Sequence, residues 1–264
     1  METNVEHRTS NAERRSEAAV FAMNQTSAIA ERICVIIPAY REGGCIGAVV
    51  VAVRRHIEPV VVVDDGSPDA TSAEAEKAGA VVIRHERNQG KAAALKKGFD
   101  YASRNGFAGV IVMDGDGQHD PEDLPRFLEA RRRTGYPVLI GNRMADCVTM
   151  PWIRRWTNRF TSWVLSREMQ GQTVPDSQCG YRFYQTDVLP KAETESKDFA
   201  AESEILLRLA DEGIKIGVVP IRTIYGDERS KIRPWRDATQ FFGVVIRHRR
   251  GRRQKRQAGG KLPS

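Results

Sequence analysis

Two carboxylates and an amide stand at alternate positions directly after an apolar run. Asp114, Asp116 and Gln118 follow the run from Gly109 to Met113. In an extended chain, residues i, i+2 and i+4 share one face, so these three side chains could aim their oxygens at one point. Oxygen ligands suit a hard cation such as Mg²⁺ or Mn²⁺, and a diphosphate could supply the remaining ligands. An acidic turn, favoured by the two intervening glycines, is the alternative interpretation.

A second acidic motif, Asp64-Asp65-Gly66-Ser67, follows the apolar run from Val60 to Val63. A carboxylate here could accept a hydrogen bond from the ring N–H of uracil or guanine, and a hydroxyl could reach a ribose. The same composition is also common in a strand-to-helix turn in which Asp caps the helix. Taken alone, the motif does not decide between a nucleoside contact and a cap.

Two further segments have the composition of ligand-binding turns. Pro38-Ala39-Tyr40-Arg41-Glu42-Gly43-Gly44 ends the first apolar run, and its glycine pair would let the backbone approach a ligand closely. No G-x-G-x-x-G follows that run, which disfavours a hydride-transfer enzyme. Asn88-Gln89-Gly90-Lys91 opens a predicted helix, where backbone N–H groups and a lysine could hold phosphate or form an ordinary cap.

The elements that must position these motifs alternate between strand and helix. Such alternation predicts βαβ units, a mainly parallel sheet flanked by helices, and ligands bound beyond the carboxyl ends of the strands. The predicted strands are 33–37, 60–63, 80–83, 109–113, 138–140 and 214–219. The predicted helices are 47–56, 71–78, 91–104, 124–133, 152–165 and 203–212.

Composition and charge narrow the class of protein. With 264 residues, 41% hydrophobic and 28% charged, the composition is that of a globular chain and excludes a collagenous, fully disordered or disulfide-scaffold protein. No apolar stretch approaches the ~20 residues of a membrane span. We expect a flexible extension over 1–30, one mixed α/β domain over 31–242 and a basic tail over 243–264. The tail holds eight Lys and Arg and no acid, so the remainder of the chain is nearly neutral although the net charge is +7.

Taken in order, the motifs resemble glycosyltransferase family 2, and within it the polyprenyl-phosphate (dolichyl-phosphate) mannosyltransferase and glucosyltransferase branch. The resemblance covers about residues 33–232 and implies a GT-A nucleotide-sugar-binding fold. It further implies inverting transfer of a sugar, typically mannose or glucose, from a UDP- or GDP-sugar to a polyprenyl phosphate, assisted by Mg²⁺ or Mn²⁺. The motifs that carry it are Val35–Glu42, Val63–Ser67, Asn88–Lys91, Met113–Gln118, Gly141-Asn142-Arg143, Asp176–Arg182 and Ser230-Lys231.

The resemblance also assigns roles to individual residues. It places Asp116, Arg143 and Arg154 in catalysis, with the two arginines facing the acceptor phosphate, and Asp114, Asp116 and Gln118 around the metal. The nucleotide-sugar would contact Pro38, Tyr40, Glu42, Asp65, Lys91, Asp114, Ser230 and Lys231. The sequence departs from the branch in two places. Where the branch commonly has an arginine a few residues before the Ser-Lys pair, Tyr225-Gly226-Asp227-Glu228-Arg229 intervenes here, and Gly115 replaces the more usual alanine.

The acceptor decides whether a general base is needed. A phosphate monoester is already anionic, so it needs cations rather than a base, and arginine binds phosphate through a planar fork that stays charged. A hydroxyl acceptor, on a cell-surface glycan or another substrate, would need a base, for which Asp176, Glu202 and Glu204 are the candidates.

The predicted helix over 152–165 carries Trp152, Trp156, Phe160 and Trp163 at helical intervals, with arginines off that stripe. This pattern is typical of a helix in a lipid headgroup layer, although burial against the sheet is equally compatible with it. We therefore expect a cytoplasmic enzyme attached peripherally to the anionic inner face of a membrane. A nucleic-acid-binding module using the basic tail is a third hypothesis, but the near-neutral body argues against it and no specific nucleic acid is expected.

Overall fold

The computed structural model describes residues 32–145, 150, 152–192, 194, 196, 200–222, 224 and 234–259. The elements below belong to one compact unit that begins at Ile33. The predicted extension over residues 1–30 and the Ser230-Lys231 pair lie outside the described residues.

The described part of the chain builds a seven-stranded mixed sheet in the order β3-β2-β1-β4-β6-β5-β7. Strands β1 to β4 are mutually parallel, β6 runs antiparallel to both of its neighbours, and β7 is parallel to β5. The strands are β1 (Ile33–Ala39), β2 (Val60–Asp64), β3 (Val81–Arg84), β4 (Gly109–Val112), β5 (Val138–Asn142), β6 (Arg182–Gln185) and β7 (Ile216–Pro220). The first, second and fourth are almost entirely apolar, as expected of strands covered on both faces.

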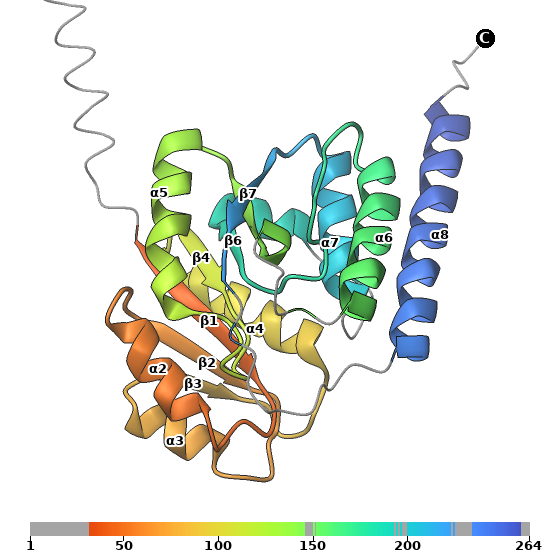
Figure 1. The fold of residues 1–264 in the computed structure, drawn as a ribbon. Coiled ribbons are helices and arrows are strands. Elements are labelled where there is room, and N and C mark those ends of the chain that lie inside the picture. The colour runs from red at the N-terminus through yellow and green to blue at the C-terminus, as the bar shows by residue number, and fades with distance from the viewer. Residues whose placement is uncertain are drawn as a thin grey trace, which may run out of the picture. The chain divides into compact units, whose positions relative to one another are not determined.

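Helices flank this sheet (Figure 1). Helix α4 packs against β1 and β2, α5 against β5 and β7, and α7 against α8. The helices are α2 (Ile46–Arg54), α3 (Thr71–Lys77), α4 (Lys91–Arg104), α5 (Leu124–Thr134), α6 (Trp152–Glu168), α7 (Ala200–Asp211) and α8 (Pro234–Gly259). Single turns of 3-10 helix occur at η1 (Pro121–Asp123) and η2 (Arg143–Ala145), and a longer one at η3 (Thr186–Ala192). The predicted α/β class and mainly parallel sheet are confirmed.

The sequence pattern did not predict β6. This strand consists of Arg182-Phe183-Tyr184-Gln185, so only two apolar residues lie between polar ends, and no alternation extends beyond them. Arg182 is nonetheless buried, because its guanidinium donates to the carbonyls of Cys179, Ser177 and Glu202. A four-residue strand that begins with an arginine lacks the local pattern of a buried strand, and its burial here depends on these backbone contacts.

The basic C-terminal segment is helical as far as Gly259, so the predicted boundary between residues 242 and 243 falls inside α8. Phe241, Val244 and Val245 are spaced along one face of α8 and are buried. Arg249 also pairs with Glu168 at the end of α6, at 2.6 Å. Among the described residues, no helix is long and apolar enough to cross a membrane.

Candidate active site

The carboxyl ends of β1, β2 and β4 bring the acidic motifs to one edge of the sheet. Asp65 N donates to the carbonyl of Ala39, and Met113 N donates to the carbonyl of Ile36. The chain therefore leaves β2 on one side of β1 and β4 on the other. This reversal of strand order is the position at which open α/β sheets bind ligands.

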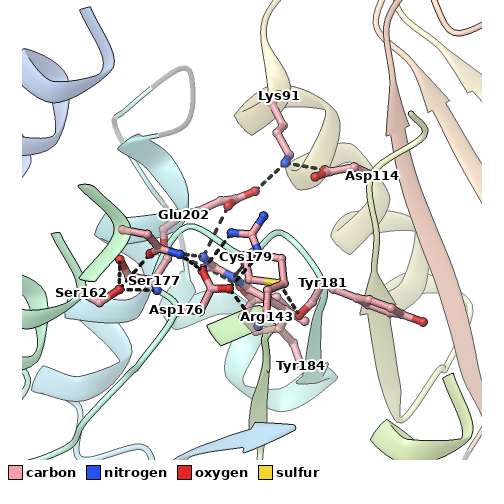
Figure 2. Close-up of polar contacts among 12 residues, drawn as sticks. Lys91, Asp114, Arg143, Ser162, Asp176, Ser177, Cys179, Tyr181, Tyr184 and Glu202 are labelled. Atoms are coloured by element: carbon pink, nitrogen blue, oxygen red, sulfur yellow. Dashed lines mark hydrogen bonds and ion pairs between the residues drawn. The ribbon is translucent and has the colours of Figure 1, made fainter. Parts of the chain in front are cut away.

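Lys91 joins the Asp114 motif to α7. Its Nζ lies 2.6 Å from Asp114 Oδ1 and 2.6 Å from Glu202 Oε1, so one ammonium bridges two carboxylates (Figure 2). Burial alone would lower the pKa of Lys91, but the two carboxylates outweigh it and the pKa is raised. Burial likewise opposes ionisation of Asp114, yet Lys91 and its other neighbours hold the pKa of that carboxyl well below its usual range. Both groups are therefore charged.

A histidine that the sequence reasoning missed closes the Asp114 loop. Asp114 N donates to His119 Nδ1 at 3.0 Å, and the His119 ring stacks on Tyr181 with centroids 5.0 Å apart. Burial is the main reason that the pKa of His119 is lowered, and a nitrogen that accepts a hydrogen bond is consistent with a neutral ring. The only signal in the sequence is its place one residue after Gln118.

The residues predicted to hold metal lie together on this loop. Gln118 N donates to Asp116 Oδ1 at 3.0 Å, an interaction that folds the loop on itself. No group of three His, Cys, Asp or Glu within the described ranges is arranged to hold a metal ion. Two carboxylates and one amide are nevertheless a hard-oxygen donor set, which fits Mg²⁺ or Mn²⁺ if oxygens of a bound diphosphate complete the coordination.

Asp65, at the end of β2, binds the Asn88–Lys91 segment that leads into α4. Its Oδ1 accepts from Gln89 N at 2.9 Å and lies 2.7 Å from His85 Nδ1, while Oδ2 accepts from Gly90 N at 2.7 Å. The carboxylate is buried, so these contacts fix the loop that leads into Lys91. Gly66 permits the tight approach because its φ is +71° and a Cβ there would lie 2.6 Å from the carbonyl carbon of Arg87.

The residues after β1 that were predicted to contact the nucleotide-sugar lie at the same edge of the sheet. Pro38 and Tyr40 are partly exposed at the end of β1, and the Arg41 guanidinium sits 5.2 Å from the centre of the Tyr40 ring. Glu42 N donates to Thr71 Oγ1 at 3.0 Å, which places Glu42 beside the start of α3. The structure thus gathers Pro38, Tyr40 and Glu42 near Asp65.

Arg143, at the end of β5, is clamped by Asp176. The guanidinium donates through Nε to Oδ2 at 2.7 Å and through Nη2 to Oδ1 at 2.9 Å (Figure 2). Asn158 of α6 also donates to Asp176 Oδ1, at 2.6 Å. Burial opposes ionisation of Asp176, but these donors, led by Arg143, hold its pKa below the usual value. Arg143 is therefore held in one orientation by a charged partner.

Arg154 lies on α6, but another set of arginines on that helix lines a groove. The groove has a volume of about 720 Å³ and runs between α6, the end of β5 and residues 173–175. Arg154 is not among its lining residues. Those from α6 are Arg155, Arg159, Ser162, Trp163, Ser166 and Arg167.

The three carboxylates considered as a base are all engaged. Asp176 binds Arg143, and Glu202 binds Lys91 and lies 3.4 Å from Arg182 Nη2. Glu204 Oε2 accepts from Ser196 Oγ at 2.6 Å, and its Oε1 lies 2.8 Å from Arg208. Each of these carboxylates thus already binds a cation or a hydroxyl group within the described part of the chain.

Solved structures show which class of fold this is. Glucosyl-3-phosphoglycerate synthase from Mycobacterium tuberculosis, crystallised with Mn²⁺ and uridine-diphosphate-glucose, superposes with a TM-score of 0.66 at 17% identity. The match covers 86% of this chain and 82% of that one. The same enzyme with Mg²⁺ and UDP gives a TM-score of 0.64. The fold is that of GT-A glycosyltransferases.

Sequence relatives identify the family. The sequence model of the family Glycosyl transferase family 2 matches residues 34–191. The chain belongs to that family and is a glycosyltransferase. It is 34% identical to polyprenol monophosphomannose synthase of Mycolicibacterium smegmatis, over 72% of this chain and 77% of the relative. It is 32% identical to undecaprenyl-phosphate mannosyltransferase of Micrococcus luteus, over 72% and 82%. The predicted resemblance is confirmed.

Proposed function

We propose that this glycosyltransferase moves a hexose, mannose or glucose, from a UDP- or GDP-sugar to a polyprenyl phosphate with inversion at the anomeric carbon. Relatives named as polyprenol and undecaprenyl-phosphate mannosyltransferases support the acceptor class. A relative from Methanococcus voltae, 29% identical, is named as a dolichyl-phosphate N-acetylglucosaminyltransferase that uses a UDP-sugar, and it supports a nucleotide-sugar donor.

The observation that carries this proposal is the contrast between Arg143 and the candidate bases. Asp176, Glu202 and Glu204 each already bind Arg143, Lys91 or Ser196, so a hydroxyl acceptor would have to displace one of these contacts to use a base among them. Asp176 binds two of the five N–H donors of Arg143 and so holds its planar, positively charged guanidinium in one orientation. A phosphate acceptor needs such a cation and no base.

On the donor side, the leaving nucleotide develops negative charge on its diphosphate. Asp114, Asp116 and Gln118 would hold Mg²⁺ or Mn²⁺, which supplies neutralising charge at that diphosphate when bound. Lys91, at the first position of α4, adds a positive charge beside Asp114. Pro38, Tyr40, Glu42 and Asp65 would surround the nucleoside, with Ser230 and Lys231 closing over the phosphates, and Arg154 would assist Arg143.

We further propose that α6 and α8 attach the enzyme peripherally to the cytoplasmic face of an anionic membrane. The aromatic stripe is exposed rather than buried against the sheet: Trp152 and Trp156 are each 71% exposed. Phe160 of α6 lies 6.3 Å from Phe242 of α8, ring centre to ring centre, so both helices contribute to one apolar surface. We call this surface the aromatic face; it comprises Trp152, Ile153, Trp156, Phe160, Trp163, Phe242 and Ile246.

Arginines border the aromatic face along the groove of α6. Within the described residues, neither Arg155 nor Arg159 has an ion-pair partner, and Arg167 stacks on Trp163 at 4.7 Å. Aromatic rings flanked by unpaired cations match the boundary between acyl chains and phosphate headgroups. Each cation near an anionic leaflet contributes up to ~1 kcal/mol of binding.

Sugar transfer measured across donors and acceptors tests the proposal. UDP- and GDP-linked glucose and mannose are offered with a short polyprenyl phosphate or its unphosphorylated alcohol, with Mn²⁺ or with a chelator. We expect transfer to the phosphate only, and only with metal. Transfer to the alcohol at a similar rate would indicate a hydroxyl acceptor instead. Full activity in the presence of chelator would show that transfer does not need the metal.

A further inference from the structure

We propose that Lys91 makes metal binding depend on the nucleotide. In the free enzyme its ammonium holds the Asp114 carboxylate that the metal needs, and a bound diphosphate draws the ammonium away. This inference rests on the proposed metal-assisted transfer and deepens it by giving the order in which the donor site is filled.

The first step in the argument is that Lys91 occupies the metal side of Asp114. Its Nζ lies 2.6 Å from Oδ1, the distance of a strong charge-assisted hydrogen bond. A divalent cation on the same oxygen would sit about 2.0–2.2 Å from it. The ammonium and the cation would then be within about 5 Å of each other, where two positive charges repel strongly in a partly buried site.

The second step is that the Lys91 backbone is fixed while its side chain can change partner. Asp65 accepts from Gln89 N and Gly90 N, which clamps the two residues immediately before Lys91. The side chain then spans from α4 to Glu202 on α7, and is 19% exposed. The ammonium can therefore turn about a fixed base toward a new anion at the exposed edge.

The third step is that the surroundings limit where the ammonium can go. A Cβ at Gly180 would lie 2.8 Å from Asp114 Oδ2 and 3.1 Å from Lys91 Nζ, so the backbone before β6 closes one side. Glu202 can retain the displaced ammonium, but its other oxygen already lies 3.4 Å from the buried Arg182. A diphosphate brings the additional negative charge that makes the displacement favourable.

The consequence is a thermodynamic coupling between two ligands. Metal alone must break the Lys91–Asp114 contact without a diphosphate to receive the ammonium. When metal and nucleotide are both present, the metal would bind Asp114 and the diphosphate, and the ammonium of Lys91 would bind the diphosphate. Coupling of this kind between sites is typically worth 5- to 150-fold in affinity.

Binding of Mn²⁺ without nucleotide tests the proposal without any measurement of turnover. Titrations of the full chain, followed by the electron paramagnetic resonance signal of free Mn²⁺, compare wild type with Lys91→Met. We expect Lys91→Met to bind Mn²⁺ about tenfold more tightly, because the carboxylate loses its competing cation. Lys97→Met, a change to an exposed lysine on the same helix, is the matched control and should leave the affinity unchanged. Equal or weaker Mn²⁺ binding by Lys91→Met would overturn the proposal.

Glu202→Gln provides a prediction of opposite sign. Without that carboxylate a displaced Lys91 loses an anion that can retain it, so Mn²⁺ binding should weaken about tenfold in the wild-type background and not at all in Lys91→Met. The double-mutant cycle therefore isolates the contribution of Lys91. An equal effect of Glu202→Gln in both backgrounds would contradict the proposed exchange. Thermal melts establish that each variant is folded before it is titrated.

A parallel titration with nucleotide separates this proposal from the proposed function. Lys91→Met should bind preformed Mn²⁺–UDP or Mn²⁺–GDP about tenfold more weakly than wild type, the reverse of its effect on Mn²⁺ alone. If the wild-type protein binds neither complex, both the proposed metal-assisted function and the proposed displacement of Lys91 by the diphosphate are wrong. If Lys91→Met binds a complex normally and shows no gain in Mn²⁺ affinity, only the proposed displacement of Lys91 is wrong.

Discussion

Arg143 and Asp176 are joined by three contacts across 33 positions of sequence. Besides the two guanidinium bonds, the backbone N–H of Arg143 donates to Asp176 Oδ2 at 3.1 Å. Both the main chain and the side chain of Arg143 are therefore fixed by one carboxylate. The pair joins the end of β5 to the segment that precedes β6, and it fixes the direction in which the guanidinium points.

Arg143→Ala should impair use of the acceptor far more than binding of the donor. Removing a charge-assisted contact to phosphate corresponds to about a 10- to 100-fold loss in kcat/KM for polyprenyl phosphate. Nucleotide affinity, measured by calorimetry, should remain close to wild type. Equal losses in both quantities would contradict a role confined to the acceptor.

Asp176→Asn should show that Asp176 positions Arg143 and does not act as a base. The amide keeps the shape but loses the charge, so we expect a raised KM for the acceptor with a smaller change in kcat, and about 1–3 kcal/mol less stability. A general base would instead lower kcat and remove the acidic limb of its pH profile. Steady-state kinetics across pH, with denaturant unfolding, distinguish the two roles.

The stability contributed by Asp176 should vanish in acid. Its pKa is lowered in the folded protein, so the contribution is present above the unfolded pKa of about 3.9 and is lost as the pH falls through the lower folded pKa. The difference in unfolding free energy between wild type and Asp176→Asn should therefore be constant from about pH 5 to 8 and shrink below about pH 4. Urea unfolding at each pH measures it, and a difference that grew in acid would be contrary to the assignment.

Asp116→Asn should abolish transfer while the fold is retained. Asp116 is partly exposed on the loop after β4, and its side chain accepts a hydrogen bond from the backbone N–H of Gln118, a bond that the amide oxygen of Asn can also accept. Circular dichroism and the melting temperature should thus match wild type. Unchanged turnover in this variant would remove Asp116 from the metal site.

The double change Trp152→Ser with Trp156→Ser should weaken membrane binding without weakening the fold. Both side chains are largely exposed, so the melting temperature should stay the same, whereas binding to vesicles containing an anionic phospholipid should fall about tenfold or more. Val51→Ser, at an exposed apolar position on α2, is the control. Sedimentation with vesicles measures binding, and equal losses in the control would point to nonspecific adsorption.

The sheet could be predicted in large part because its strands are continuous apolar runs. Residues 91–104 were predicted as a helix and form α4 with those bounds. The positions of the polar motifs directly after β1, β2 and β4 could also be predicted, because each motif follows an apolar run in the sequence. Strand β6 could not be predicted in this way, because the burial of Arg182 depends in part on the backbone carbonyl and the carboxylate of Glu202 in α7.

The candidate site was predictable in its residue types but not in its pairings. Lys91 was expected to meet phosphate, and in the structure it also bridges Asp114 and Glu202. Asp176 was a candidate base, yet it orients Arg143. Such ion pairs join α4 to α7 and β5 to the chain before β6, and no sequence spacing encodes which distant charge a side chain will meet.

The reversed direction of β6 has a consequence for how substrate preference can change. The segment before β6 and the loops after β1, β2 and β4 reach the same edge from opposite ends of their strands. Under the proposed function, Asp65 and Asp114 on the donor side then come from the first half of the chain, and Arg143 and Asp176 on the acceptor side come from the second. Insertions or replacements near Asp176 and α6 could thus alter which acceptor is recognised and leave nucleotide recognition intact. A single nucleotide-sugar scaffold can in this way serve many different acceptors.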